Sequence, residues 1–327
     1  MADPLRIGIL GAAAITPSAL IKPARDVPEA LAFAVAARDP GRARAFANKH
    51  SLPRVHESYD SLIDDPEVDA VYNPLPNSLH AEWTIRALEA GKAVLCEKPL
   101  ASNADEAQRM AETAEKTGRP LMEAFHWRYH PLAERMRQVI LSGRLGRAHH
   151  FEMDMCLPVP RPGDIRFNLA LAGGSTMDMG CYCISILRFL ADSEPEVVSA
   201  HAKLMGAGVD RYMRAELRFS DDRSAAFTAS LLAFTPPRLR ARVVGTKGEM
   251  RVTNPVAPHW FHRLTIRNEA GTTRETEPGR TSYTHQLEAF VRLVRDGIPV
   301  PTDARDAVLN MSTIDAVYTA AGLRRRG

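Results

Sequence analysis

Cysteine is scarce in this chain of 327 residues, and long apolar runs are absent. The four cysteines, Cys96, Cys156, Cys181 and Cys183, lack the spacing of a disulfide framework, and four thiols in a chain this long suggest a reducing cytoplasm. The Cys-x-Cys pair lacks the third and fourth ligands of a structural zinc site, although Cys156 could in principle join it, so we expect no metal. No run reaches the ~18 apolar residues that span a bilayer, so we expect no membrane partner.

The chain also has little excess charge of either sign, because its net charge is only +3. It gives no electrostatic reason to expect nucleic acid or an anionic membrane as a partner. We interpret the terminal run Arg324-Arg325-Arg326 as a solvated tail rather than a binding patch. The length suits two domains, and the content of 45% hydrophobic and 25% charged residues is an ordinary globular balance.

Short apolar runs alternate with helical patterns over residues 1–125. This alternation is typical of a parallel sheet with helices on both faces, in which ligands bind at the carboxyl ends of the strands. The predicted strands are 5–10, 31–37, 68–73, 93–97 and 120–125, and the predicted helices begin near residue 17 and cover 43–50, 78–91 and 103–118.

The turn after the first predicted strand reads GAAAIT, where a dinucleotide-binding fingerprint would read G-x-G-x-x-G. Only the first glycine is kept, and alanine and Thr16 replace the others. Alanine is small enough to let a pyrophosphate approach the backbone closely. A tight turn without a ligand is the alternative. The expected cofactor contacts here are Gly11, Ala13, Ala14 and Ile15.

The end of the second predicted strand bears on the choice of cofactor. A carboxylate there binds the ribose 2′-hydroxyl of NAD, whereas an arginine accommodates the 2′-phosphate of NADP. Arg38 comes first, Asp39 follows, and Arg42 lies one turn on. This order favours NADP over NAD. The alternative is that Arg38 is a loop cation paired with Asp39.

Lysine is also uncommon, with seven lysines against 35 arginines, so Lys98 stands out. It follows the fourth predicted strand in CEKPL and precedes a proline, which restricts its backbone to extended forms. A lysine held there can hydrogen-bond a substrate hydroxyl and lower its pKa. A snorkelling cation at a strand edge is the alternative. We expect the nicotinamide to lie near this stretch and near YNPLPNSLH (72–80), with contacts from Asn73, Pro74, Asn77, His80, Glu97 and Lys98.

The turn at 11–16, YNPLPNSLH, EKP (97–99) and GGSTMDMGCY (173–182) together resemble the Gfo/Idh/MocA oxidoreductases, in family order and over nearly the whole chain. The resemblance implies an α/β protein with an N-terminal Rossmann domain and a C-terminal α+β domain built on a large, open, mainly antiparallel sheet. We place these domains at 1–125 and 126–327. The resemblance also implies a cis Lys98–Pro99 bond and a homodimer or higher homo-oligomer formed through the C-terminal sheet.

The histidine position of the family's GG…D-x-G-x-H motif holds Tyr182 here, four residues after Asp178. This departure resembles the NADP-dependent branch of dimeric dihydrodiol dehydrogenase and D-xylose 1-dehydrogenase, in which lysine and tyrosine share the role. A free tyrosine, with a pKa of ~10, is a poor base at neutral pH, and a nearby ammonium favours the phenolate. We therefore expect Tyr182 to act as acid/base, Lys98 to tune it and Asp178 to orient the substrate. A buried aromatic and a helix cap are the alternatives for Tyr182 and Asp178.

The second half predicts a different architecture. A helix over 126–146, a strand over 149–157, an irregular loop over 158–174 and a helix over 175–190 come first. Recurrent strands then suggest an antiparallel sheet; they cover 196–205, 212–219, 223–234, 239–244, 248–253 and 262–268, and helices over 284–297 and 304–321 end the chain. The candidates for substrate contact are His126, Arg128, Tyr129 and His130 after the first domain, Asp164, Arg166 and Asn168 in the loop, and Asp178 and Tyr182. Of the first four we expect one or two to touch substrate, and a structural role is the alternative for each.

These features predict an enzyme that transfers hydride reversibly between NADP and a secondary alcohol or carbonyl of a small molecule. Sugars, cyclitols and trans-dihydrodiol-like compounds are the substrate classes that the resemblance implies. A sugar or deoxysugar ketone reductase is the alternative within enzymes. A non-catalytic NADP-binding regulator is the alternative from another class, but the presence of both Lys98 and Tyr182 argues against it. The sequence specifies neither the substrate nor the preferred direction.

Overall fold

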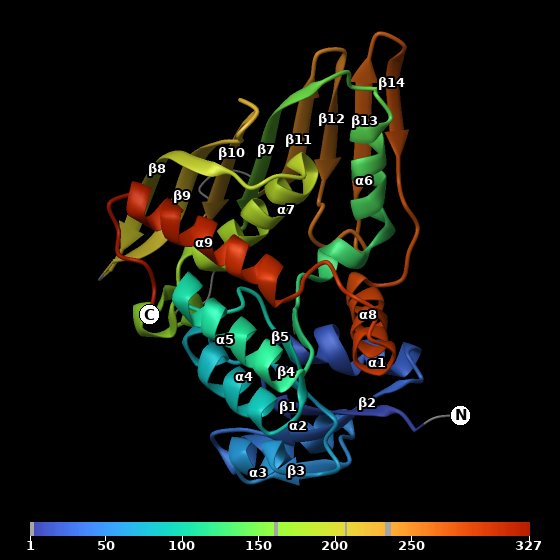
Figure 1. Ribbon diagram of the computed structural model, residues 1–327, viewed down its shortest axis with the longest axis vertical. Coiled ribbons are helices and arrows are strands. Elements are labelled where there is room, and N and C mark those ends of the chain that lie inside the picture. Colours follow the sequence, from blue (N-terminus) through green and yellow to red (C-terminus); the bar gives the residue numbers. More distant parts are fainter. Residues whose placement is uncertain (1–2, 160–162, 207, 233–236) are drawn as a thin grey trace. The chain divides into compact units, whose positions relative to one another are not determined.

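The computed structural model describes residues 3–159, 163–206, 208–232 and 237–327, and the chain forms two units (Figure 1). The first unit is Met1–Tyr129 with Tyr283–Val308, and the second is His130–Ser282 with Leu309–Gly327. The chain therefore returns to the first unit near its end, a return that the division predicted at residue 125 does not include.

A parallel sheet forms the centre of the first unit. Its strand order is β3-β2-β1-β4-β5-β6 over the described residues, and each neighbouring pair is parallel. This is the strand order of doubly wound dinucleotide-binding domains, and the order reverses between β1 and β4. The predicted fold of this half is confirmed. The strands are β1 (Leu5–Leu10), β2 (Ala30–Ala36), β3 (Arg54–His56), β4 (Ala70–Asn73), β5 (Ala93–Cys96) and β6 (Leu121–Glu123).

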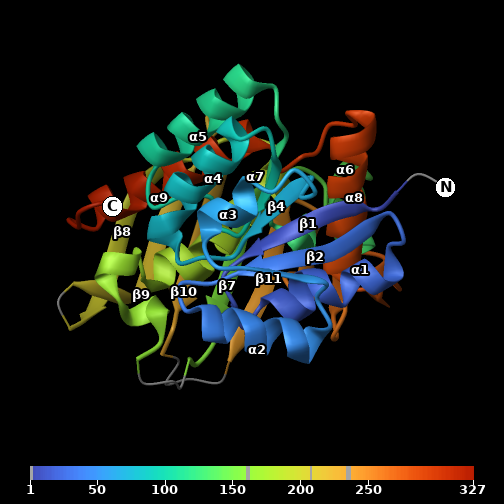
Figure 2. The same ribbon diagram turned by 90° about the horizontal axis from the view of Figure 1, so that it is seen from below.

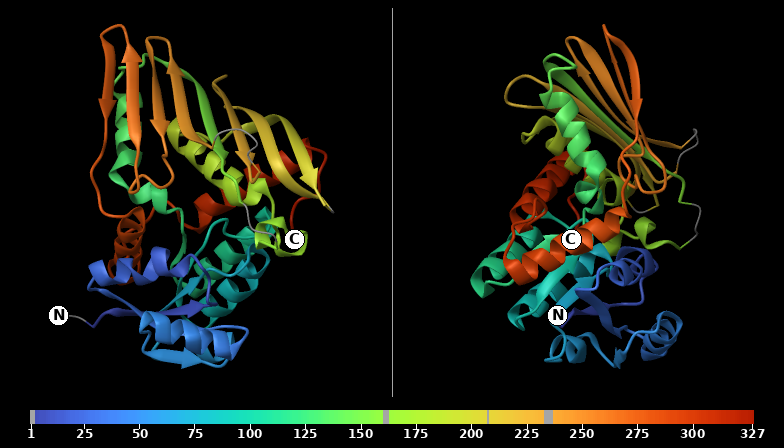
Figure 3. Two further views of the ribbon diagram at one scale, coloured as in Figure 1. Left: turned by 180° about the vertical axis from the view of Figure 1, so that it is seen from behind. Right: turned by 90° about the vertical axis from the view of Figure 1, so that its right-hand side faces the viewer.

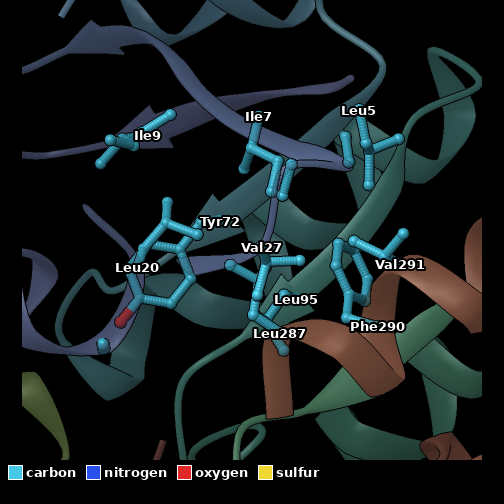
Figure 4. Close-up of a cluster of buried hydrophobic side chains, with 14 of the residues drawn as sticks. Leu5, Ile7, Ile9, Leu20, Val27, Tyr72, Leu95, Leu287, Phe290 and Val291 are labelled. Carbon is cyan, nitrogen blue, oxygen red and sulfur yellow. The ribbon is translucent and has the colours of Figure 1, made fainter. Parts of the chain in front are cut away.

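Helical segments connect these strands and cover the sheet. α4 and α5 lie side by side (Figures 1 and 2). On one face, Ile7, Ile9, Tyr72 and Leu95 of the strands pack with side chains of η1 and α8 (Figure 4). The helical segments are η1 (Pro17–Ile21), α1 (Pro23–Asp26), α2 (Pro40–His50), α3 (Tyr59–Ile63), η2 (Asn77–Leu79), α4 (His80–Glu89), α5 (Ala104–Thr117), η3 (His126–Tyr129) and α8 (Ser282–Asp296).

A large, mainly antiparallel sheet forms the centre of the second unit. Over the described residues its order is β14-β13-β12-β11-β7-β10-β9-β8, and the pairing of β7 with β10 is parallel while the others are antiparallel. The predicted architecture of this half is confirmed. The strands are β7 (Ala148–Cys156), β8 (Glu196–Met205), β9 (Val209–Arg218), β10 (Ser224–Ser230), β11 (Arg238–Gly245), β12 (Gly248–Thr253), β13 (Arg263–Asn268) and β14 (Gly271–Glu275).

Helices cover one face of this second sheet. α6 (Pro131–Leu141) and α7 (Cys181–Ala191) lie against it, and the view from behind shows the strands in front of them (Figure 3). Burial alternates along β9, where Met213, Ala215 and Leu217 are buried and the residues between them are exposed. α9 (Ala304–Ala320) begins in the first unit and continues into the second.

Several local expectations are corrected by the structure. The predicted helix 126–146 is interrupted, because His130 is the N-cap of α6. The predicted helix 175–190 starts with a π-helical turn, η6 (Thr176–Gly180). Residues 233 and 234 of the predicted strand 223–234, and residues 160–162 of the predicted loop, lie outside the described residues. The strands β3 and β14 and the helix α3 were not predicted.

The arginine run at the end of the chain is not wholly a solvated tail. Arg324 and Arg325 are exposed, but Arg326 is only 5% exposed and forms an ion pair of 2.6 Å with the fully buried Asp210. The prediction was wrong for Arg326 because its partner lies more than a hundred residues away in the sequence. Charge runs alone do not reveal such a partner.

Over the described ranges, no helix combines the length and apolar composition needed to cross a membrane. Among the same residues, no three His, Cys, Asp or Glu side chains are grouped closely enough to hold a metal ion.

Candidate active site

The turn after β1 leaves its backbone open to a ligand. Gly11 has a φ of +85°, and a Cβ there would lie 3.0 Å from Leu75. Only glycine suits both conditions, which explains why the first position of the fingerprint is a glycine. Ala14 and Ile15 are exposed at the turn, and Ala13 is half-buried with its carbonyl accepting from the N–H of Thr16. This glycine-containing cradle at the start of a helical segment fits the pyrophosphate of a dinucleotide.

Two arginines lie at the end of β2, and Asp39 does not neutralise them. The Asp39 carboxylate accepts hydrogen bonds from the backbone N–H groups of Gly41 (2.8 Å) and Arg42 (3.4 Å), so it caps α2. Arg38 and Arg42 are exposed, and neither forms an ion pair within the described part of the chain. The alternative of an Arg38–Asp39 pair is therefore not observed.

Tyr59 adds a hydroxyl to this end of the unit. Its oxygen lies 3.7 Å from the position of a Cβ on Gly11, and its ring contacts Trp83 at 4.8 Å. Burial raises the pKa of Tyr59, and a hydrogen bond from the backbone of Arg38, together with the charges of Arg38 and Arg42, opposes this rise. Tyr59 was not predicted as a site residue, because α3 was not predicted. The pattern Ser58–Ser61, which forms a capping box at the start of α3, was the available signal.

Asn73 and His80 hold the turn after β4. The Asn73 amide donates to the Thr84 hydroxyl (3.1 Å) and to the backbone carbonyl of His80 (3.3 Å). The His80 ring lies between two carbonyl oxygens, those of Pro99 (2.9 Å from Nδ1) and Leu75 (2.7 Å from Nε2). Both side chains are fully buried, and their polar atoms form hydrogen bonds within the protein.

The His80 ring joins the stretch 72–80 to the stretch 96–100. A carbonyl oxygen can only accept, so two simultaneous hydrogen bonds require both ring nitrogens to be protonated. Burial opposes that charge by lowering the pKa of His80, and the two acceptors favour it. Of the other expected contacts in this stretch, Pro74 is buried and Asn77 is half-buried at the start of η2.

Lys98 follows β5 and is half-buried, and the Lys98–Pro99 bond is cis, as the resemblance implied. The preceding residue, Glu97, accepts a hydrogen bond of 2.7 Å from the hydroxyl of Tyr72. Burial, and then the charge of Glu97, raise the pKa of Tyr72 well above its ordinary value, so this tyrosine stays a donor. The Tyr72–Glu97 bond fixes the backbone immediately before the lysine.

Of the candidates after β6, His126 and His130 are buried, and Arg128 and Tyr129 are half-buried. His126 is 3% exposed, and its ring stacks on Tyr283 of α8 with centroids 4.0 Å apart. The Arg128 guanidinium lies 5.8 Å from the ring of Trp127. The Tyr129 hydroxyl hydrogen-bonds the Thr302 hydroxyl (2.7 Å), and His130 caps α6 through its Nδ1.

The first two glycines of GGSTMDMGCY, Gly173 and Gly174, are required by close contacts. A Cβ on Gly173 would lie 2.6 Å from the carbonyl oxygen of Arg166, and one on Gly174 would lie 2.1 Å from a carboxylate oxygen of Asp210. Gly174 also has a φ of +142°. The first glycine thus lets the loop over 163–172 approach, and the second lets the chain approach a buried carboxylate.

Arg166 links two carboxylates of the second unit. Its Nε donates to Asp178 (2.8 Å) and its Nη1 donates to both oxygens of Asp164 (3.1 Å each). The Asp178 charge raises the pKa of Arg166 further, so the guanidinium stays protonated. Its side chain is 41% exposed against 19% for Asp178, so the guanidinium keeps surface that a ligand can reach. Asn168 uses its side chain locally, to accept from the N–H of Ala170.

Asp178 and Tyr182 lie on either side of the junction between η6 and α7. The N-caps of these segments are Ser175 and Gly180, so Asp178 is not a helix cap. A π turn often marks a functional site, because it re-aims the side chains within a helix. Tyr182 is 6% exposed at the first turn of α7.

The cysteines near Tyr182 are packing residues. All four cysteines of the chain are free and buried. Burial raises the pKa of Cys183, as it does for Cys96 and Cys156, so these thiols stay protonated and lack the thiolate that metal binding or redox chemistry needs.

The fold and these motifs define a two-domain oxidoreductase of the dinucleotide-binding class. Residues 5–125 match the model of the oxidoreductase family with an NAD-binding Rossmann fold, and residues 133–251 match the GFO/IDH/MocA C-terminal domain. The chain belongs to the Gfo/Idh/MocA family of oxidoreductases. This confirms the resemblance inferred from the sequence.

Individual relatives span most of the chain. The D-xylose 1-dehydrogenase (NADP(+)) 2 of Haloferax volcanii is 37% identical over 321 residues, 97% of each protein. The trans-1,2-dihydrobenzene-1,2-diol dehydrogenase of Macaca fascicularis is 37% identical over 226 residues, 68% of this chain and 66% of that protein.

A solved structure shows the same fold. A 3-ketoreductase from Actinomadura kijaniata, in complex with NADP and TDP-benzene, matches with a TM-score of 0.90 and 28% identity over 98% of each chain. Further structures of that enzyme with both ligands contain a substituted tyrosine in one case and a substituted lysine in another.

Proposed function

We propose that this oxidoreductase uses NADP(H) to interconvert a secondary alcohol and a carbonyl on a sugar, a cyclitol or a dihydrodiol-like small molecule. One observation carries the proposal. In the 3-ketoreductase, the substituted lysine and tyrosine are separated by the same number of residues as Lys98 and Tyr182. This equal spacing supports Lys98 and Tyr182 as the catalytic pair.

The preference for NADP is supported by the end of β2. Arg38 and Arg42 are exposed there, and Asp39 is engaged as the cap of α2, so two guanidinium groups are left for a 2′-phosphate. Tyr59 supplies a hydroxyl beside them. The turn at Gly11, which has a φ of +85°, is where we place the pyrophosphate.

The chemistry assigned to the side chains is proton transfer and orientation. The bound nicotinamide supplies or accepts the hydride. In the oxidative direction, the Tyr182 oxygen takes the proton of the substrate hydroxyl, and in the reductive direction it returns that proton to the carbonyl oxygen. The Lys98 ammonium stabilises the phenolate form between these events. Asp178, held by Arg166, accepts a hydrogen bond from a substrate hydroxyl and so orients the sugar or diol.

Reduction of a keto sugar is the second candidate, in the same site. The 3-ketoreductase favours it, because its likeness covers 98% of both chains. Turnover with NADP and diols, pentoses, hexoses or cyclitols, against turnover with NADPH and keto sugars, distinguishes the two directions. A chain that binds NADP tightly and turns over none of these compounds would instead be a regulator.

Replacement of Tyr182 by phenylalanine tests the acid/base assignment. A general acid/base contributes about 10²- to 10⁴-fold to the rate, so Tyr182→Phe should lower kcat by that order. NADP affinity, measured by fluorescence titration, should be unchanged. Tyr212→Phe, a half-buried tyrosine of β9, is the matched control. A near-normal kcat in Tyr182→Phe would remove this residue from the mechanism.

We also propose a homodimer formed through the exposed face of the second sheet, and a cytoplasmic location. Cross-strand ion pairs such as Arg240–Asp154 (2.8 Å) and Arg242–Glu249 (2.9 Å) lie on that face and supply polar groups for a symmetric contact. The four free thiols support a reducing compartment. Sedimentation analysis of wild type and Arg240→Glu tests the dimer, which the reversed charge should weaken.

A further inference from the structure

A fully buried carboxylate lies beside the segment that carries Asp178 and Tyr182. It belongs to Asp210, the second residue of β9, which has no exposed surface. One oxygen, Oδ2, accepts from the Ser175 hydroxyl (2.9 Å), the Thr176 hydroxyl (2.7 Å) and the Thr176 backbone N–H (2.7 Å). These bonds fix the backbone at the start of η6, two residues before Asp178.

The other oxygen of Asp210 is held by the end of the chain. Oδ1 accepts from the Tyr318 hydroxyl (3.0 Å) and from Nη2 of Arg326 (2.6 Å). The Arg326 guanidinium also lies 4.4 Å from the Tyr318 ring centroid and donates to the carbonyl of Gly208 (3.4 Å). A carboxylate without exposed surface needs such a cation, because burial of an unpaired charge is strongly unfavourable.

The same terminal segment contacts the helix junction a second time. Asn310 of α9, which is fully buried, donates from its amide nitrogen to the carbonyl oxygen of Cys181 (3.3 Å). This contact lies directly before Tyr182. α9 and the residues after it therefore hold the stretch 175–181 at both ends, through Asp210 at the start and directly at the end.

The approach at Gly174 shows how closely this stretch is seated. A Cβ there would lie 2.1 Å from Oδ1 of Asp210 and 3.0 Å from the Tyr318 hydroxyl. The backbone thus lies against the network itself. A shift of the Asp210 carboxylate must move the chain that leads into η6, since no side chain lies between them to absorb the change.

We propose that Arg326 is a positioning residue for the proposed reaction, acting through Asp210 to hold the η6–α7 junction that presents Asp178 and Tyr182. This inference rests on the proposed function for its catalytic readout. Loss of Arg326 leaves a buried carboxylate without its cation, and the segment bonded to that carboxylate relaxes. Misplacement of a catalytic group by about 1 Å can cost on the order of 10²-fold in rate.

The test compares Arg326→Ala with Arg325→Ala. Arg325 is the exposed neighbour of Arg326, and its guanidinium forms a long ion pair of 3.8 Å with Asp315. We expect kcat to fall at least tenfold in Arg326→Ala, with less than a twofold change in the dissociation constant for NADP. The pH profile of kcat should shift, because the environment of Tyr182 changes. Arg326→Lys should recover part of the lost rate, and Arg325→Ala should match wild type in every measurement.

Hydrogen exchange gives a readout that does not depend on turnover. Amides over 176–182 should exchange faster in Arg326→Ala than in wild type or Arg325→Ala, with the strands of the first unit unchanged. Wild-type kcat and wild-type exchange in a folded Arg326→Ala would overturn the proposal. If Arg326→Ala fails to fold, wild-type kcat, pH profile and exchange in Arg326→Lys would overturn it equally, since Arg326 would then serve folding alone. Absence of wild-type turnover on every substrate would overturn the proposed function, and the exchange experiment would still decide the positioning role.

Discussion

Removal of the Arg38 guanidinium should weaken the binding of NADP more than the binding of NAD. Arg38 is exposed and forms no ion pair within the described residues, while Asp39 is committed to the backbone N–H groups of Gly41 and Arg42. Arg38→Ala therefore breaks no side-chain ion pair of the folded protein. It takes away one cation from the group formed by Arg38, Arg42 and Tyr59, and it leaves the turn at Gly11 intact.

The expected magnitude follows from the strength of a charge-assisted hydrogen bond. Such a bond contributes about 1.5–3 kcal/mol, which corresponds to about 10- to 150-fold in affinity. Solvent and salt screen an exposed guanidinium, so we expect the lower end, about tenfold, with a larger effect at low ionic strength. NAD lacks the 2′-phosphate, so its affinity should change less than twofold.

Steady-state KM values for NADP and NAD, measured at two ionic strengths, check this prediction. Arg44→Ala is the control, because Arg44 is also an exposed arginine of α2 and pairs with Glu57 at 3.1 Å. Equal losses for the two cofactors would refute the assignment of the 2′-phosphate to this end of β2. A loss for NADP that does not depend on ionic strength would refute the electrostatic reasoning.

Two further predictions concern the framework of each unit. His80→Leu removes the ring that lies between the buried carbonyl oxygens of Pro99 and Leu75. A neutral imidazole donates to one of them at a time, so the loss is about 1–3 kcal/mol. Thermal unfolding should therefore occur at a lower temperature and kcat should fall; an unchanged melting temperature would contradict this. The pKa of Glu275 is lowered, chiefly by its hydrogen bond from Arg135, so its ion pair should stabilise the protein at neutral pH and lose this effect as the pH falls below about 4. The melting temperatures of Glu275→Gln and wild type should therefore differ at pH 7 and converge in acid, while the exposed Glu269→Gln should follow wild type throughout.

The elements that the sequence predicted well are those with a complete pattern of their own. The apolar run over 5–10 and the long helical pattern over 103–118 specify burial by themselves, and the structure has β1 and α5 there. β3 and α3 span three and five residues and are only partly buried, so neither shows a recognisable period. Tyr59 was missed for this reason, although it lies beside Arg38.

The residues that hold the second half of the site could not be predicted from local sequence patterns, because their partners are distant in the sequence. Asp210 bonds Thr176, 34 residues earlier, and Arg326, 116 residues later. An acidic residue at a strand start and an arginine near a chain end each look like surface residues in isolation. Only the folded sheet brings them together, and this network explains Gly174, whose backbone lies against the Asp210 carboxylate.

The side chains of some motif residues hold the framework of the site. Asn73 and His80 were expected to touch the cofactor, yet their side chains are fully buried and bonded to Thr84 and to backbone carbonyls. Arg38 and Arg166 come from less distinctive stretches, and they keep exposed guanidinium surface. Substitution of Asn73 or His80 should therefore disturb the turns and lower the activity with every substrate to a similar extent. Substitution of Arg38 or Arg166 should instead change which cofactor or substrate is preferred. We therefore expect substrate choice to depend on the loop that carries Arg166, which is bonded to Asp178 and has a side chain that is 41% exposed.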